Sequence, residues 1–122
     1  MNTILIVDDD SRNIRALGAL LKTRGYDIQT ATAMSEAFAL MKGRKPSVIL
    51  LDMMMPEMDG YQALSILRAD DDWHSIPVIA VTAQAMKGDR EKCLLHGATD
   101  YLSKPIDVDR MLEMLKSYSE YD

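Results

Sequence analysis

The amino-acid sequence predicts an α/β fold: a doubly wound, five-stranded parallel sheet with five helices on its two faces. The first observation is that five strand-like segments are each followed by a helix-like segment, an alternation typical of parallel sheets. The second is that three of these strands, residues 3–7, 48–51 and 77–81, are continuously apolar, as strands covered on both faces are. Residues 27–31 and 100–102 are less apolar, so we expect them at the edges of the sheet.

Length and composition exclude several classes of protein. The chain has 122 residues, which is typical of one domain, so we expect a single domain over residues 1–122. A net charge of −5 argues against direct nucleic-acid binding. One cysteine permits no internal disulfide and suits a cytoplasmic protein. Because no apolar run approaches the roughly 18 residues of a membrane span, we expect no membrane contact.

Two helices are expected in the first half of the chain. Ser11 is a possible cap for the first helix, whose apolar residues continue at helical spacing to Leu21 before Gly25 ends it. The second helix is expected over residues 34–41, where apolar side chains again recur at helical spacing, and Gly43 ends it. Both helices follow a strand closely, so strands and helices alternate without a linker.

Three more helices are expected in the second half. Asp59 and Gln62 have the spacing of a capping box, which predicts that the third helix begins there. An acidic loop over residues 69–77 then leads to the next strand. Apolar residues at helical spacing predict the fourth helix over residues 86–96 and the fifth over residues 111–118.

Polar side chains follow four of the predicted strands, at the point where each strand ends. These are Asp8, Asp9, Asp52, Thr82 and Lys104. Because right-handed crossovers place the carboxyl ends of parallel strands at one edge of the sheet, we expect these side chains to meet in one small pocket. Carboxylates packed together repel each other, and hard oxygen ligands of this kind suit Mg²⁺.

The other two polar groups suggest what the pocket binds besides a metal. The charge of Lys104 can offset that of a phosphoryl group, and the hydroxyl of Thr82 can donate a hydrogen bond to it. A carboxylate nucleophile that takes a phosphoryl group is an established chemistry. Asp52 follows the apolar run 48–51 directly, so we predict that it is the nucleophile of a metal-assisted aspartyl-phosphate site.

The same residues resemble the receiver domain of bacterial response regulators, over the whole chain. The motifs that carry the resemblance are Val7-Asp8-Asp9, Leu51-Asp52-Met-Met-Met-Pro56 with Met58-Asp-Gly60, Val81-Thr82-Ala83 and Lys104-Pro105. Residues 10–13 and 85–95 are most similar to receivers of hybrid sensor kinases, and stand-alone chemotaxis-type regulators are also similar. The resemblance implies a flavodoxin-like sheet with strand order 2-1-3-4-5.

The resemblance also implies roles for the acids. Asp52 accepts a phosphoryl group from a phosphohistidine on a histidine kinase or a histidine phosphotransfer domain. Asp8, Asp9, Asp52 and the backbone carbonyl of Met54 hold Mg²⁺. The protein is then a signalling switch in a two-component system or phosphorelay, and it catalyses the phosphorylation and dephosphorylation of its own aspartate rather than acting as an enzyme.

A second set of residues is implied in switching. Thr82 and Lys104 contact the phosphoryl group, Tyr101 changes rotamer as Thr82 moves, and the peptide bond before Pro105 is cis. The face formed by the fourth helix, the fifth strand and the fifth helix then controls a downstream protein. Its exposed part is expected to include Tyr101, Ile106 and some of Met86, Met111 and Met114.

Several single residues have two interpretations. Asp10 is either an acid at a helix start or a metal ligand. Asn13 either lines the mouth of the pocket or is a plain amide on a helix face, which is the safer interpretation. At least one of Met53, Met54 and Met55 is expected in the core. We interpret Cys93 as a buried helix residue and residues 70–74 as a solvated loop.

Two side chains beside the expected phosphoryl group can affect how long it remains on Asp52. Met54 stands two residues after Asp52, where the receiver pattern often has a polar residue, and its thioether is a poor ligand for Mg²⁺. Gln84 stands two residues after Thr82 and is a polar neighbour that can influence an attacking water.

Two alternative functions use the same residues. A haloacid-dehalogenase-like Mg²⁺ phosphatase also forms an aspartyl phosphate, and Asp8 with Asp10 supplies its D-x-D pattern. That enzyme would leave Asp52 without a role, and the chain has no room for the usual cap insertion. A phosphorylation-silent interaction module of the same fold is the other alternative, and the intact set of acids with Thr82 and Lys104 argues against it.

Overall fold

The computed structural model describes residues 2–56, 58–83 and 86–119, and over these residues five strands alternate with five helices. Gln84 lies outside the described residues. The elements are β1 (Thr3–Val7), α1 (Ser11–Thr23), β2 (Asp27–Ala31), α2 (Met34–Gly43), β3 (Val48–Asp52), α3 (Gly60–Ala69), β4 (Val78–Thr82), α4 (Asp89–Leu95), β5 (Asp100–Ser103) and α5 (Val108–Ser119). Among the described residues, no helix has both the length and the apolar character needed to cross a membrane.

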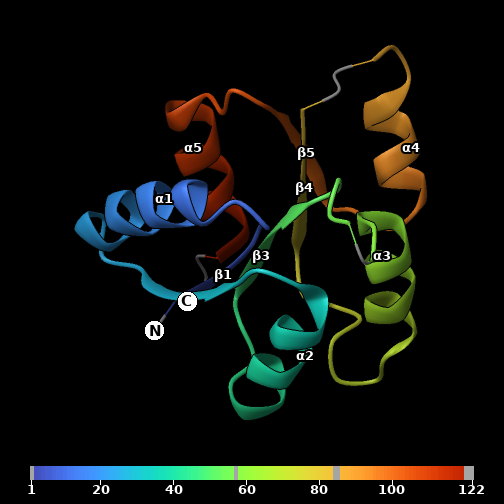
Figure 1. Cartoon of the computed structure of the whole chain (residues 1–122), viewed down its shortest axis with the longest axis horizontal. Helices are drawn as coiled ribbons and strands as arrows, with labels where there is room; N and C mark the ends of the chain where they lie inside the picture. The colour runs from blue at the N-terminus through green and yellow to red at the C-terminus, as the bar shows by residue number, and fades with distance from the viewer. Residues whose placement is uncertain (1, 57, 84–85, 120–122) are drawn as a thin grey trace.

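The strands form a parallel sheet in the order β2-β1-β3-β4-β5, which confirms the predicted fold class and order. Helices α1 and α5 cover one face of the sheet, and α2, α3 and α4 cover the other (Figure 1). β1 contributes to the hydrophobic core on both faces of the sheet. Ile4 and Ile6 pack towards α1 and α5, whereas Leu5 and Val7 pack towards α2 and α3. Burial on both faces explains why the central strands are continuously apolar.

The edge strands are also as predicted. Every residue of β1, β3 and β4 is buried, whereas β2 and β5 keep several residues partly exposed. A strand at the edge of a sheet is covered less completely, so it tolerates polar residues such as Gln29 and Asp100.

Three helix starts differ from the sequence prediction, and the simplest difference is that α5 begins at Val108, three residues earlier than predicted. Asp10, not Ser11, caps α1, because its carboxylate accepts the backbone N–H of Arg12 while Ser11 is already helical. α4 begins at Asp89, three residues later than predicted. Gly88 has a φ of 85°, a left-handed conformation that interrupts the helical spacing running through Met86.

The turn between β3 and α3 depends on Gly60. A Cβ atom at this position would lie 2.2 Å from the sulfur of Met53 and 2.8 Å from its Cα. The absence of a side chain therefore lets the start of α3 close on the end of β3, where the N–H of Gly60 donates to the carbonyl of Met53. Asp59 and Gln62 form the predicted capping box, and together these contacts fix the loop that follows Asp52.

Candidate functional site

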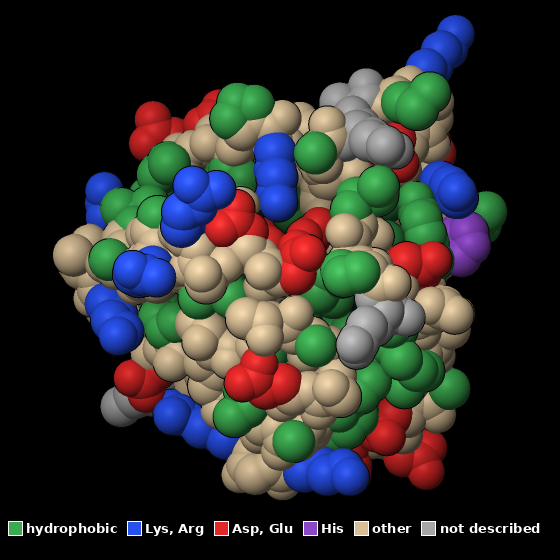
Figure 2. Space-filling model, viewed as in Figure 1, with side chains coloured by type: hydrophobic (Ala, Val, Ile, Leu, Met, Phe, Trp, Pro, Cys, Tyr) green, Lys and Arg blue, Asp and Glu red, His purple; other side chains and the backbone are tan. Residues whose placement is uncertain are grey.

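The three predicted carboxylates lie together at the carboxyl edge of the sheet. Asp8 follows β1 directly and Asp52 ends β3, and these strands are neighbours. The residues Asp8 and Asp52 are only 4% and 5% exposed, whereas Asp9 is exposed. One oxygen from each of the three carboxylates lies within 4.8 Å of the other two. Figure 2 shows acidic side chains near the middle of this face, with basic side chains beside them.

Hydrogen bonds hold the two buried carboxylates in place. The N–H of Met54 donates to Oδ1 of Asp52 over 3.0 Å, and the N–H of Asp10 donates to Oδ1 of Asp8 over 2.9 Å. The amide Nδ2 of Asn13 donates to Oδ2 of Asp8 over 3.3 Å. The interpretation of Asn13 as a plain helix-face amide was therefore wrong: it reaches the acidic cluster from the first turn of α1.

Lys104 extends into the cluster from the end of β5. Its Nζ lies 3.4 Å from Oδ2 of Asp8 and 3.9 Å from Oδ2 of Asp52. The backbone N–H of Lys104 donates to the carbonyl of Thr82, so the ends of β4 and β5 are joined directly. The peptide bond from Lys104 to Pro105 is cis, as the resemblance implies. Thr82 itself is 3% exposed.

Burial and mutual repulsion disfavour the ionised form of Asp52 in the cluster. Burial raises the pKa of Asp52, and the charge of Asp8 acts in the same direction. The N–H of Met54 and the ammonium of Lys104 lower this pKa but do not cancel the rise. A small cluster of hard oxygen ligands with surplus negative charge is the donor set that Mg²⁺ prefers, so the residues present fit this metal.

Asp10 does not join the cluster. Its carboxylate caps α1 and lies 3.6 Å from the guanidinium of Arg12. The backbone N–H of Arg12 is the main reason that the pKa of Asp10 lies below its usual value. Of the two interpretations of this residue, the structure supports the helix-start acid. The D-x-D pattern of the phosphatase alternative therefore contributes only Asp8 to the pocket.

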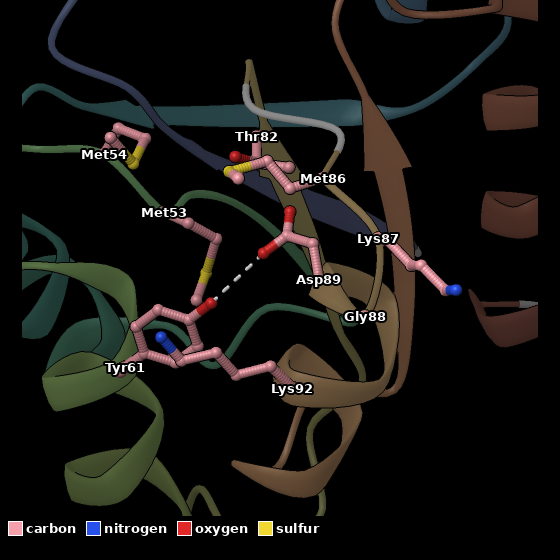
Figure 3. Close-up of a pocket in the computed structure, with 9 residues that line it drawn as sticks. All are labelled: Met53, Met54, Tyr61, Thr82, Met86, Lys87, Gly88, Asp89 and Lys92. Carbon is pink, nitrogen blue, oxygen red and sulfur yellow. Dashed lines mark hydrogen bonds between the residues drawn. The ribbon is translucent and has the colours of Figure 1, made fainter.

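Thr82 and the start of α4 border a cavity of about 390 Å³ beside the acids. Figure 3 shows Met53 and Tyr61 on one side of this cavity, with Thr82 and Asp89 on the other. Tyr101 is half-buried, and its hydroxyl donates to the carboxylate of Asp89 over 2.8 Å. Tyr101, to which the resemblance gives a switching role, is therefore bonded to the first residue of α4.

The methionines divide between core and surface. Met53 and Met55 are buried, as are Met111 and Met114 of α5. Met54 is 51% exposed at the rim of the pocket, and Met86 is 71% exposed before α4. Of the three methionines expected on the switching face, Met86 is therefore the exposed one, and Tyr101 and Ile106 are half-buried.

Two further predictions concern residues away from the pocket. Cys93 is buried, and burial raises the pKa of its thiol, so a nucleophilic role is disfavoured. Asp71 and Asp72 are exposed in the loop that follows α3, as predicted. Trp73 of this loop stacks on Phe38 of α2 with ring centroids 5.6 Å apart, so its ring packs within the molecule.

Comparison with known proteins gives consistent matches along the whole chain. The family model described as the response regulator receiver domain matches residues 4–116. A polar-differentiation response regulator, DivK from Brucella anthropi, is 41% identical over 117 residues, which cover 95% of this chain and 94% of the relative.

Solved structures give the same picture. The receiver domain of a sensor histidine kinase from Pseudomonas aeruginosa, determined with a magnesium ion coordinated in its active-site cleft, is 33% identical. It covers 96% of both chains with a TM-score of 0.85. The receiver domain of a Francisella response regulator is 28% identical, with a TM-score of 0.89 over 98% of this chain and 97% of the other.

Proposed function

This chain belongs to the response regulator receiver domain family, and on that premise we propose that Asp52 accepts a phosphoryl group from a phosphohistidine. The donor is a histidine kinase or a histidine phosphotransfer domain, and residues 1–122 act as one receiver domain in a two-component system or phosphorelay. The observation that carries this proposal is the position of Asp52, buried beside Asp8 and Asp9 with the ammonium of Lys104 within 3.9 Å.

Asp8, Asp9, Asp52 and the carbonyl of Met54 would hold Mg²⁺. The convergence of the three carboxylates supports this set, and the hydrogen bond from Met54 to Asp52 keeps the Met54 backbone at the pocket. When bound, Mg²⁺ would neutralise negative charge on the carboxylates and on the phosphoryl oxygens. Asp8 is fixed for this purpose by its bonds from Asp10 and Asn13.

The chain's own residues position the reacting atoms. The N–H of Met54 fixes the Asp52 carboxylate, whose oxygen forms the new O–P bond. The P–N bond to the donor histidine breaks, its electron pair stays on the imidazole nitrogen, and that nitrogen takes a proton from solvent. The ammonium of Lys104 offsets the charge of the phosphoryl oxygens, and the hydroxyl of Thr82 donates a hydrogen bond to one of them.

Phosphorylation would then change the surface of the molecule. A phosphoryl group adds roughly −1.5 to −2 charge at the edge of the sheet. Thr82 moves to bond the new oxygens and Tyr101 changes rotamer with it, so the face formed by α4, β5 and α5 is rearranged for a downstream protein. Later attack of water on phosphorus releases phosphate and restores the Asp52 carboxylate. Met54, whose exposed thioether lies at this rim, is expected to affect how fast water attacks.

A single experiment distinguishes the proposed phosphorylation from the alternative, a phosphorylation-silent interaction module. The protein is incubated with acetyl phosphate and Mg²⁺, and the modified residue is mapped by mass spectrometry. We expect one phosphoryl group, on Asp52, and none in Asp52→Asn. The matched control is Asp72→Asn, which removes an exposed loop acid and should be labelled like the wild type.

Either of two results would contradict the proposal. Labelling of another residue in the wild type would reassign the acceptor. No labelling by acetyl phosphate and none by any phosphohistidine donor, from protein that is shown to be folded, would favour the silent module.

A further inference from the structure

Helix α4 packs on the rest of the molecule through a small apolar face. It has seven residues, all of them described, of which Cys93 is buried and Leu94 is partly buried against the core. A helix with so small an apolar face gains little from packing, so polar contacts carry more of its attachment. Some of these contacts come from Tyr61 of α3. Its ring lies 4.6 Å from Nζ of Lys92, and its centroid lies 4.8 Å from that of His96.

A carboxylate at the first residue of α4 joins three elements. The hydroxyl of Tyr101, from β5, donates to Oδ2 of Asp89 over 2.8 Å. The hydroxyl of Tyr61, from α3, donates to Oδ1 over 3.5 Å, the contact drawn as a dashed line in Figure 3. Asp89, Tyr61 and Tyr101 are called the Asp89 cluster below. Burial, with a further contribution from Asp89, raises the pKa of Tyr101 to about 12, so this phenol remains a hydrogen-bond donor at neutral pH.

The Asp89 cluster lies beside the expected switch. Asp89 and Thr82 line the same cavity, and they are seven positions apart in the chain. Figure 3 shows the Asp89 carboxylate turned towards the cavity, whereas Lys87 points away from it. A displacement of Thr82 towards Asp52 is therefore expected to move the start of α4 relative to Tyr101. The negative charge that arrives with a phosphoryl group also repels the Asp89 carboxylate across this cavity.

We propose that Asp89 is a positioning residue, whose carboxylate holds Tyr101 and the start of α4 in the unphosphorylated arrangement and must release Tyr101 when the protein switches. This inference rests on the proposed phosphorylation of Asp52. A bond that exists in one of two states shifts the equilibrium towards that state. Removing the bond should therefore favour the phosphorylated arrangement.

The test measures the affinity for beryllofluoride, a mimic of the phosphoryl group, in the full chain saturated with Mg²⁺. The apparent Kd is followed through the amide NMR signal of Thr82. Asp89→Asn keeps the shape of the side chain but weakens the acceptor, and it should bind beryllofluoride roughly three to ten times more tightly than the wild type. Tyr101→Phe removes the same hydrogen bond from the other side and should give a similar gain.

Three further variants make the comparison specific. The double variant of Asp89→Asn with Tyr101→Phe should gain no more than either single variant, because both remove one bond. Tyr61→Phe should have a smaller effect, since its contact with Asp89 is longer. Glu91→Gln removes an exposed acid from the same first turn of α4 and should leave the affinity unchanged.

The outcomes separate this inference from the proposed function. If the wild type responds to beryllofluoride but Asp89→Asn and Tyr101→Phe both stay within twofold of Glu91→Gln, the inference is overturned while the function stands. Weaker binding by both variants also overturns it, because the contact would then belong to the phosphorylated arrangement. A wild type that does not respond to Mg²⁺ with beryllofluoride overturns the proposed function, and the role of Asp89 with it.

Discussion

Charged side chains at the two ends of the sheet have opposite kinds of neighbour. At the amino end, the guanidinium of Arg68, which projects from α3, donates to the carbonyls of Gly97, His74 and Ile76 and to the hydroxyl of Thr99. At the carboxyl end, a cluster of acids gathers around one lysine side chain that lies within 4 Å of two of them. One end has a cation surrounded by acceptors, and the other has anions that exceed the neighbouring positive charge.

This difference between the two ends indicates that one stabilises the fold and the other provides the functional site. Burial lowers the pKa of Arg68, but its partners are oriented acceptors that offset the loss of water. Gly97 permits this arrangement, because a Cβ there would lie 2.9 Å from Cγ of Arg68 and its φ is 115°. Burial raises the pKa of Asp52 instead, and its neighbour Asp8 adds to the rise. The amino end is therefore expected to stabilise the fold, and the carboxyl end to bind cations.

The largest expected effect is at the amino end. Arg68→Met leaves the carbonyls of Gly97, His74 and Ile76 without their side-chain donor, so we expect the free energy of unfolding to fall by about 2–3 kcal/mol. Urea denaturation measures it. The matched control is Arg90→Met, which replaces an exposed arginine of α4 and should change stability by less than about 0.5 kcal/mol. Equal losses in the two variants would show that Arg68 does not organise this end.

The second largest effect is stabilisation by Mg²⁺, which should depend on Asp9 but not on its neighbour Asp10. At a Mg²⁺ concentration about ten times its Kd, the free energy of unfolding of the wild type should rise by about 1.4 kcal/mol. Asp9→Asn should lose this gain. Asp10→Asn should keep it, because asparagine still caps α1 and Asp10 lies outside the cluster. Thermal unfolding with and without Mg²⁺ makes the comparison, and an equal response of the two variants would contradict the assigned ligands.

The smallest effect concerns the amide that holds Asp8. Asn13→Ala removes one neutral donor to a carboxylate, worth about 0.5–1 kcal/mol, so the affinity for Mg²⁺ should fall roughly two- to fivefold. Isothermal titration calorimetry measures the change. Ser11→Ala, in the same first turn of α1, should bind Mg²⁺ like the wild type. A normal affinity in Asn13→Ala would mean that Asp10 alone positions Asp8.

The acids of the pocket could be predicted from sequence because strand periodicity decides their place. A run such as Ile4 to Val7 is buried on both faces, and the residue that follows it must leave the sheet at the carboxyl edge. The same argument applies to Asp52 and Thr82. The roles of Asp52, Thr82 and Lys104 in phosphoryl transfer follow from the same polar residues and from the family resemblance, and they remain predictions for the experiments above.

Other features depend on geometry that local sequence does not encode. The partners of Arg68 include Gly97 and Thr99, 29 and 31 residues away, and nothing in the sequence around Arg68 indicates these distant partners. Asn13 looked like a helix-face amide because its bond to Asp8 spans the turn before α1. The late start of α4 follows from the left-handed conformation of Gly88, which apolar spacing does not reveal.

The central claim, that the carboxyl end concentrates repulsive charge, is tested most directly by the stability of Asp52→Asn without divalent metal. A carboxyl whose pKa is higher in the folded than in the unfolded state opposes folding when it ionises. Its contribution to stability is complete below the unfolded value, about 3.9, and is lost as pH rises through the folded value.

We therefore predict that Asp52→Asn, which cannot ionise, has a larger free energy of unfolding than the wild type at neutral pH, by on the order of 1 kcal/mol. The advantage should shrink as pH falls and should vanish below about pH 4. Chemical denaturation across this pH range, in the presence of a chelator, gives both quantities. A variant that is less stable than the wild type at neutral pH would contradict the account.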